Sequence, residues 1–246
     1  MALNPYLETI LAGIIWGSSG IFVKYLNLPS TTVTFFRLAI PTLILLLFFI
    51  IKKIELFQGN NKLILLASTL NAGRVYLYTV GFTFASIGNA IIVLYTWPVF
   101  TTVFGILFLK EKVSKRTFFL LFLALMGTAL IYFNKEFSFS DKNFIGMTAM
   151  LFSAVIYAFT VIIFKKESEK YSKYETIFYQ NIIGSLIFIP FILINKPLPT
   201  ISQASIGIVY GALIGLVGFV FFFSALKRLK ASTVSFLSYA EVISAI

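Results

Sequence analysis

Residues 31–51 read TTVTFFRLAIPTLILLLFFII, a run that carries a single charged residue, Arg37. At a rise of about 1.5 Å per residue, a helix of this length covers a hydrocarbon core of about 30 Å. The second half of the run, from Leu43 to Ile51, does not alternate polar and apolar residues as a strand of a membrane β-barrel does. The stretch is therefore predicted to be a transmembrane helix.

Comparable runs recur along the whole chain, separated by short loops. Of the 246 residues, 59% are apolar and 12% are charged, whereas about a quarter are charged in a soluble domain. This composition excludes a soluble globular protein and a disordered chain. It predicts an all-α polytopic membrane protein with nine spans, at residues 6–26, 31–51, 62–84, 88–109, 116–133, 144–164, 175–194, 204–224 and 231–246.

The ninth run reaches Ile246 without a polar flank. A terminal carboxylate there would lie in hydrocarbon, which is costly. We therefore expect the chain to be a fragment from which the rest of this helix and a tenth helix are missing.

The basic residues predict the orientation, because cytoplasmic loops of membrane proteins are enriched in Lys and Arg. With a cytoplasmic N-terminus, 14 basic residues lie in inside loops and 4 in outside loops. We therefore predict a multi-pass protein of the inner or plasma membrane with its N-terminus inside. The net charge of +11 then reflects topology and contact with anionic lipid rather than nucleic-acid binding. The inside residues are Lys52, Lys53, Lys62, Lys110, Lys112, Lys115, Arg116, Lys165, Lys166, Lys170, Lys173, Lys227, Arg228 and Lys230, and the outside ones are Lys24, Lys135, Lys142 and Lys196.

The two halves of the chain resemble each other at an offset of 141 to 144 residues. Because each half would hold five helices, an odd number, the second copy inserts upside down. Inverted repeats are frequent in secondary transporters, with the site near mid-membrane between the halves. We predict an inverted 5+5 repeat with halves at residues 1–136 and 137–246. The matching features are Trp16 and Lys24 with Tyr157 and Lys165, residues 35–37 (FFR) with 178–180 (FYQ), and 95–99 (YTWPV) with 239–243 (YAEVI).

Four stretches resemble the drug/metabolite transporter superfamily, in particular its EamA-type permeases. They are residues 13–19 (GIIWGSS), 36–38 (FRL), a segment from Ala85 through 97–100 (WPVF) to 109–112 (LKEK), and 237–241 (LSYAE). The resemblance implies ten helices and, more often than uptake, efflux of amino acids or similar metabolites. The chain departs from the family in its nine runs and in Val242, where a proline often follows the ninth-helix glutamate.

Two opposite charges lie near the middle of predicted spans, where charge is expensive and usually faces a cavity or a partner. Arg74 is about 18 Å and Glu241 about 15 Å from the inner edge. We predict that Arg74 binds an anionic group such as a substrate carboxylate, and that Glu241 carries a proton or balances a cation. An Arg74–Glu241 ion pair that ties helices together is the structural alternative. Arg37, about 9 Å below the outer edge, is predicted to reach the headgroups as a topology anchor.

Aromatic residues gather at the same depth, although Trp and Tyr normally favour the membrane interface. This placement suggests a cavity wall suited to planar solutes or ammonium groups, with simple packing as the alternative. Asn71, Arg74 and Tyr78 also share one face of the third run. The predicted substrate site consists of Trp16, Asn71, Arg74, Tyr78, Tyr95, Trp97, Tyr157 and Tyr239, with Glu241 as the proton-coupling group or counter-charge.

Three further features are predicted to be structural. Glycines repeat at every fourth position at Gly13 and Gly17, and again at 207, 211 and 215, a spacing that lets helices pack closely. Glu111 is expected to be a loop ion pair or turn residue. Glu8 and Glu175 are expected to lie at the interface.

The sequence has no enzyme signature such as GxSxG, Walker A, HExxH or GxGxxG in context. It has no Cys and no His, and we expect neither a cofactor nor a metal. The favoured function is a secondary transporter that moves a small organic metabolite, an amino acid or related carboxylate, by alternating access in the direction of efflux. The alternatives are an uptake permease for a cationic nutrient such as a quaternary amine, or a non-transporting membrane assembly protein.

Overall fold

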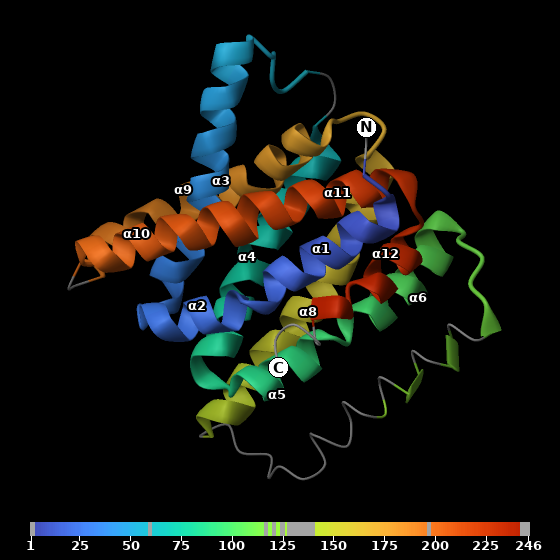
Figure 1. Ribbon diagram of the computed structural model, residues 1–246, viewed down its shortest axis with the longest axis horizontal. Helices are drawn as coiled ribbons and strands as arrows, with labels where there is room; N and C mark the ends of the chain where they lie inside the picture. Colours follow the sequence, from blue (N-terminus) through green and yellow to red (C-terminus); the bar gives the residue numbers. More distant parts are fainter. Residues whose placement is uncertain are drawn as a thin grey trace.

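A computed structural model describes residues 3–58, 61–115, 118–119, 122–123, 126, 141–195 and 198–241. The described elements are helical throughout (Figure 1). They are α1 (Pro5–Gly17), α2 (Ser19–Leu26), α3 (Ser30–Lys52), α4 (Lys62–Phe84), α5 (Ile87–Leu94), α6 (Trp97–Leu109), α8 (Lys142–Glu167), α9 (Lys173–Ile194), α10 (Ile201–Tyr210), the π-helix η1 (Gly211–Val217), α11 (Gly218–Arg228) and α12 (Ala231–Leu237).

Seven helical segments in this part of the chain are long and apolar enough to cross a membrane. They coincide, within a few residues, with seven of the predicted runs, which confirms the all-α polytopic class. Most of the predicted run 116–133 and the end of the run 231–246, including Val242, lie outside the described residues. The seven segments are Pro5–Leu26, Ser30–Lys52, Lys62–Phe84, Ile87–Leu109, Lys142–Glu167, Lys173–Ile194 and Ile201–Arg228.

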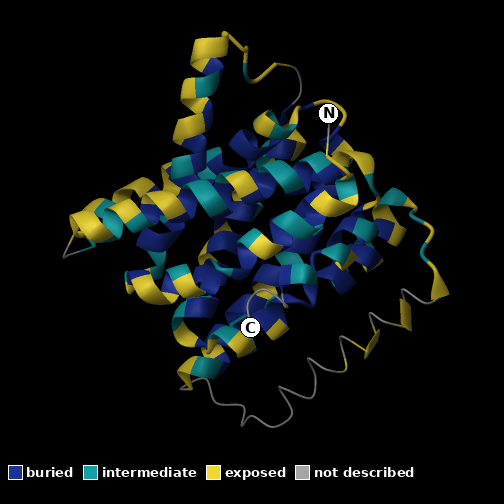
Figure 2. Ribbon diagram, viewed as in Figure 1, coloured by how far each residue is buried: buried dark blue, intermediate teal, exposed yellow. Residues whose placement is uncertain are grey.

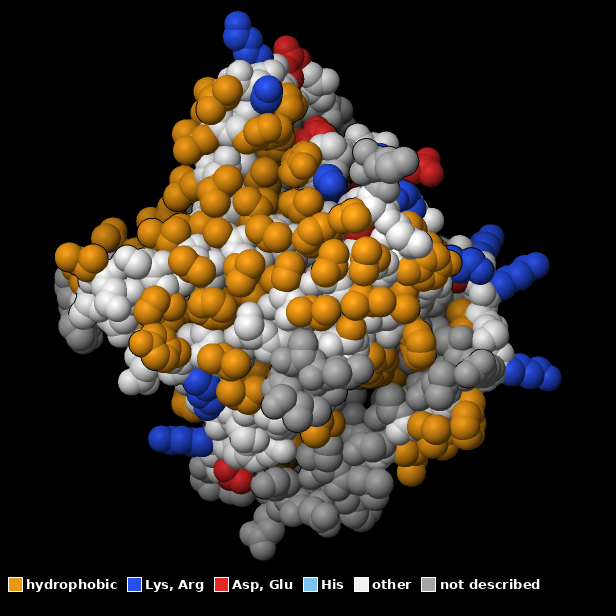
Figure 3. Space-filling model, viewed as in Figure 1, with side chains coloured by type: hydrophobic (Ala, Val, Ile, Leu, Met, Phe, Trp, Pro, Cys, Tyr) orange, Lys and Arg blue, Asp and Glu red, His pale blue; other side chains and the backbone are white. Residues whose placement is uncertain are grey.

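The outside of the bundle is apolar, and its inside carries polar groups. Apolar side chains cover much of the visible face, whereas Lys and Arg lie near its margins (Figure 3). The last turns of α3 stand clear of the other helices (Figures 1 and 2), and Leu47, Ile50 and Ile51 are exposed there. Arg37 and Arg74, by contrast, are buried. This arrangement suits a lipid surround, which solvates apolar side chains and excludes charges.

Three spans are interrupted where they cross the interior. Ser18 separates α1 from α2, and Tyr95 and Thr96 separate α5 from α6. A turn at Ser238 and Tyr239 follows α12. Pro98, which has no backbone N–H, occupies the first turn of α6, where that group is not needed. Interrupted backbone at membrane depth is tolerated where protein surrounds it or where it lines a cavity.

Glycines bring the eighth predicted span against α3. A Cβ atom at Gly211 would lie 2.3 Å from the Phe36 carbonyl oxygen, and one at Gly215 would lie 2.5 Å from the Arg37 carbonyl oxygen. Such distances are possible only because glycine has no side chain. The glycine repeat therefore does allow close packing, and its partner is the segment of α3 that carries Arg37.

We predict that Gly211→Ala lowers the thermal midpoint of the protein. The clash is with backbone, which cannot rotate aside, and overpacking of this kind costs about 1–3 kcal/mol. Gly73→Ala is the matched control, because a Cβ there meets nothing within 4 Å and alanine favours the helix. Thermal unfolding of both variants in one detergent checks the expectation, and equal midpoints would contradict the close contact.

Candidate functional site

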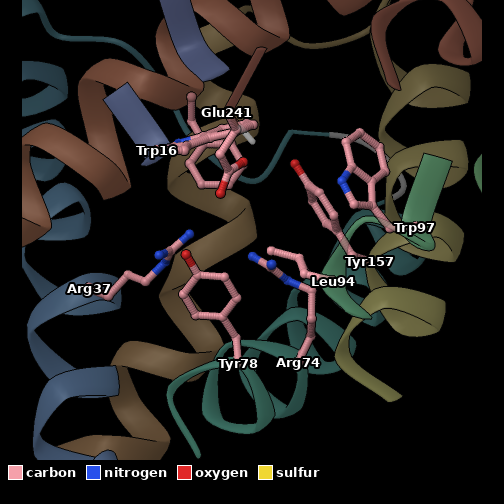
Figure 4. Close-up of a pocket in the computed structure, with 9 residues that line it drawn as sticks. Trp16, Arg37, Arg74, Tyr78, Leu94, Trp97, Tyr157 and Glu241 are labelled. Atoms are coloured by element: carbon pink, nitrogen blue, oxygen red, sulfur yellow. The ribbon is translucent and has the colours of Figure 1, made fainter. Parts of the chain in front are cut away.

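A narrow cavity lies in the interior of the bundle, with walls supplied by spans from both ends of the chain (Figure 4). Its empty volume is about 310 Å³. Most of this volume lies in crevices between side chains, so the cavity in this conformation takes water-sized groups. The lining residues are Trp16, Arg37, Arg74, Tyr78, Leu94, Trp97, Tyr157, Phe219 and Glu241. Six of them belong to the predicted site: Trp16, Arg74, Tyr78, Trp97, Tyr157 and Glu241.

Arg74 extends from α4 into this cavity and is only 2% exposed. Its Nε donates a hydrogen bond of 3.0 Å to Asn71 Oδ1, and its guanidinium carbon lies 4.3 Å from the centroid of the Tyr157 ring. The Nη2 atom is buried and has no hydrogen-bond partner. Because a buried unsatisfied cationic donor is costly, this end of the side chain is suited to an anionic ligand.

Asn71 holds Arg74 from behind rather than lining the cavity. Its Nδ2 donates to the Gln180 carbonyl oxygen at 3.0 Å, while its Oδ1 accepts from Arg74. The amide is thereby oriented from α9, the helix packed beside α4. Asn71 therefore positions the guanidinium, and the shared helix face predicted for the two residues is present.

Arg37 was predicted to reach the headgroups as a topology anchor, and this prediction is wrong. The side chain is 4% exposed and lines the cavity. Its Nη1 donates to Ser19 Oγ at 3.2 Å and to the Tyr210 hydroxyl at 3.1 Å. Its guanidinium carbon lies 4.6 Å from the centroid of the Tyr78 ring. The prediction failed because depth alone does not tell which face of a helix a residue occupies.

A signal for this inward orientation was present in α3. Thr34, three residues before Arg37, is buried on the same side of α3, and the buried stripe continues through Leu38 to Thr42. Thr34 bonds to Thr79, and Thr42 bonds to Ser185, both at 2.8 Å. Hydroxyl residues at helical spacing mark the side that faces other helices rather than lipid, and Arg37 falls within that stripe.

Glu241 lies across the cavity from the arginines and is 4% exposed (Figure 4). Its carboxylate accepts a hydrogen bond of 2.5 Å from the Tyr95 hydroxyl, which also lies 2.7 Å from the Ser238 carbonyl oxygen. The Tyr239 hydroxyl donates to the Tyr95 carbonyl oxygen at 2.9 Å. Two interrupted spans are thus fastened to each other at their breaks. Tyr95 and Tyr239 lie behind the cavity lining.

Aromatic rings form the remaining walls. The Trp16 ring lies 4.9 Å from Phe219 and 5.2 Å from Phe222, between centroids. Its Nε1 donates to the Ile214 carbonyl oxygen in η1 at 3.2 Å. Trp97 packs at 4.8 Å from Tyr157. Because η1 is a π-helix, a form that recurs at functional sites, its contact with Trp16 links the cavity wall to the glycine-packed interface with α3.

The cavity carries an excess of positive charge. It presents the guanidinium groups of Arg37 and Arg74 and one carboxylate, that of Glu241. Within the described part of the chain, the ion pairs closer than 4 Å are Lys170–Glu167 and Arg228–Glu8, and neither cavity arginine belongs to one. The predicted alternative of a direct Arg74–Glu241 ion pair is therefore not formed in this conformation.

The three carboxylates that the sequence singled out away from mid-membrane, Glu8, Glu111 and Glu175, all make structural contacts. Glu111 accepts hydrogen bonds from the backbone of Ala231 and Ser232, at 2.8 and 3.1 Å, and so caps the start of α12. Glu8, expected at the interface, is 4% exposed and pairs with Arg228. Glu175 forms a capping box with Ser172 at the start of α9.

Interrupted apolar helices around a charged central cavity define a class, the multi-pass membrane transporters. Within that class, the chain belongs to the EamA-like transporter family, which matches residues 4–133 and 144–246. The family resemblance stated from the sequence is thereby confirmed. The family consists of transporters, so the chain is a membrane transporter.

Several relatives are similar to nearly the whole chain. The Pseudopaline exporter CntI of Pseudomonas aeruginosa is 25% identical over 240 residues, which cover 96% of this chain and 83% of the relative. The S-adenosylmethionine uptake transporter of Rickettsia bellii is 23% identical over 269 residues, 99% of this chain and 86% of the relative. Solute carrier family 35 member G1 of Mus musculus is 24% identical over 249 residues, which cover 96% of this chain and 68% of the relative. These relatives include transport in both directions.

A solved crystal structure has the same fold. It superposes with a TM-score of 0.74 and covers 98% of this chain and 85% of its own chain, at 15% sequence identity. At this identity the likeness concerns the arrangement of the helices alone.

Proposed function

We propose that this protein is a secondary transporter that moves a small organic solute with a carboxylate group by alternating access. The observation that carries the proposal is the buried Arg74 Nη2, which faces the cavity without a hydrogen-bond partner. A carboxylate would supply that partner and neutralise the charge. We propose export as the direction, as in the pseudopaline exporter, and the plasma membrane as the location.

The pattern of helix contacts supports the inverted repeat on which this mechanism rests. In an inverted repeat the first span corresponds to α8, and α3 corresponds to α9. The span from α10 to α11 then corresponds to α4, and α12 corresponds to α5–α6. A two-fold rotation that relates the halves must turn each contact between two helices into a contact between their counterparts. The contact of α4 with α8 becomes that of α11 with α1, and both are present. Likewise the contact of α4 with α9 has its counterpart in the contact of η1 with α3. The contact of α6 with α8 has its counterpart in the contact of α12 with α1. Rocking of two such halves is the expected movement.

Glu241 supports a coupling role for a proton or a counter-charge role for a cation. Its carboxylate faces the cavity from the opposite side to Arg74 (Figure 4) and is bonded to Tyr95 at a helix break. A group that gains or loses charge at this point would alter the attraction between the two halves. We infer that protonation of Glu241 is coupled to the opening of the bundle.

The second candidate function is uptake of a cationic nutrient. It is favoured by the aromatic wall of Trp16, Trp97 and Tyr157, because aromatic faces attract cations. The two arginines oppose it, since they outnumber the single carboxylate. Thermal-shift assays with carboxylate and quaternary-amine ligands separate the two candidates, because the preferred class should raise the midpoint.

We expect Arg74→Gln to reduce counterflow of carboxylate solutes in liposomes at least tenfold, since glutamine keeps much of the size of the side chain but loses the charge. Loss of a charged hydrogen bond costs about 1.5–3 kcal/mol, which is tenfold or more. Lys52→Gln, far from the cavity, is the control for net charge. Unchanged counterflow of every carboxylate solute by Arg74→Gln would remove the proposed site.

We expect Glu241→Gln to abolish accumulation driven by a pH gradient while exchange of substrate continues. Glutamine cannot carry the proton, but it can still accept the Tyr95 hydrogen bond. The measurement is uptake into liposomes with and without an imposed gradient. Gradient-driven accumulation by the variant would exclude Glu241 as the proton carrier.

The orientation is tested with single cysteines, because the natural chain has none. With the N-terminus inside, Gln58→Cys, between α3 and α4, lies in the cytoplasm, and Leu198→Cys, between α9 and α10, lies outside. A membrane-impermeant maleimide should label Leu198→Cys in intact cells and Gln58→Cys only after permeabilisation. The reverse labelling would invert the topology.

A further inference from the structure

Arg37 and Arg74 present two guanidinium groups to one cavity. Arg37 was expected to contact headgroups, and the proposed function uses only Arg74. Both side chains are almost completely buried, and both line the cavity with Glu241. The nearest partners of Arg37 are the hydroxyls of Ser19 and Tyr210, which are neutral. Each arginine therefore has hydrogen-bond support but no adjacent carboxylate.

Burial of this charge is energetically unfavourable without an anion. Removing an ion from water costs several kcal/mol even after relaxation, and only an opposite charge in good geometry offsets this cost. One carboxylate stands against two guanidinium groups in the cavity lining, which leaves an excess of one positive charge. Two like charges that line one cavity also repel each other. A solute with net negative charge would offset both the cost of burying the excess positive charge and the repulsion between the two arginines.

The two arginines occupy separate positions on the cavity wall. The Arg37 guanidinium carbon lies 4.6 Å from the Tyr78 ring centroid, whereas that of Arg74 lies 4.3 Å from the Tyr157 centroid. Figure 4 shows the two side chains on opposite sides of Tyr78, both directed toward the space below Glu241. An anion that met both guanidinium groups at one point would require them to converge. Their separation instead provides one binding point on each side of Tyr78.

We propose that, when the bundle opens and widens the water-sized cavity of this conformation, Arg37 and Arg74 bind the two acidic groups of one solute, an amino dicarboxylate whose ammonium group faces Glu241. Two carboxylates and one ammonium give the solute a charge of −1, which balances the cavity. The ammonium is directed to the carboxylate and to the aromatic wall, both of which attract cations. The inference rests on the proposed function and narrows its substrate class.

The binding assay uses the two tryptophans of the chain, Trp16 and Trp97, which both line the cavity. Intrinsic fluorescence therefore reports on the cavity without background from other tryptophans. The full chain in lipid nanodiscs is titrated with aspartate, glutamate and 2-aminoadipate, which differ in the distance between the acidic groups. Asparagine, glutamine and norleucine are the monocarboxylate controls. At least one dicarboxylate should bind tenfold or more tightly than its control.

The variants separate the roles of the two arginines. Arg37→Gln should weaken dicarboxylate binding tenfold or more, to the level of the monocarboxylate controls, because only the second acidic group loses its partner. Arg74→Gln should weaken binding of dicarboxylates and of the monocarboxylate controls alike. Arg37→Lys, which keeps the charge without the planar fork, should retain part of the preference for dicarboxylates. Lys52→Gln controls for net charge and should bind as the unmodified chain does.

Each outcome bears on the inference. Equal binding of dicarboxylates and monocarboxylates by the unmodified chain would overturn it, even if Arg37→Gln failed to fold. Equal weakening of both classes by Arg37→Gln would also overturn it, since that result indicates a structural role. In either case, counterflow of monocarboxylates that depends on Arg74 would leave the proposed function standing. If no carboxylate solute showed binding or counterflow, both this inference and the proposed function would be wrong.

Discussion

Two buried guanidinium groups within a hydrocarbon layer impose the organisation of the helices around them. A charge at this depth must be surrounded by protein groups that donate, accept or polarise. Arg74 therefore needs Asn71 at its back and the Tyr157 ring against its face. Arg37 needs hydroxyls from the first and eighth spans. These contacts tie together helices that are distant in sequence.

The interrupted helices solve a second problem, which is to bring polar backbone to the same depth. At Tyr95 and at Ser238 the helical hydrogen-bond ladder is broken, and carbonyl oxygens become available within the bundle. Each break supplies a partner to the other: the Tyr95 hydroxyl donates to Glu241 and lies 2.7 Å from the Ser238 carbonyl oxygen, and the Tyr239 hydroxyl donates to the backbone carbonyl of Tyr95. Reciprocal bonding of this kind is what a duplicated helix pair would produce at its crossing point.

Charge at mid-span was visible in the sequence, because hydropathy measures depth well. Arg74, Glu241 and the shared face of Asn71 were identified in this way. Hydropathy does not measure rotation about the helix axis, which is why Arg37 was assigned to the headgroups. The position of Tyr95 behind the lining depends on the break after Leu94, which a continuous helix of residues 88–109 does not contain. The side of the helix on which Arg37 lies and the position of the helix break after Leu94 both depend on contacts with other helices. The hydropathy of one span carries no information about such contacts.

The cap that Glu111 provides has a mechanical consequence. Its carboxylate, at the end of α6, satisfies two amide groups and a hydroxyl at the start of α12. Separation of these two helices would leave the Glu111 carboxylate and these three donors without their partners. Between η1 and α3, by contrast, Gly211 and Gly215 meet the backbone of Phe36 and Arg37 and the apolar side chains of Ile40 and Pro41. Because the polar bonds from Glu111 are costlier to break than such apolar contacts, we expect α6 and α12 to move together when the bundle changes shape.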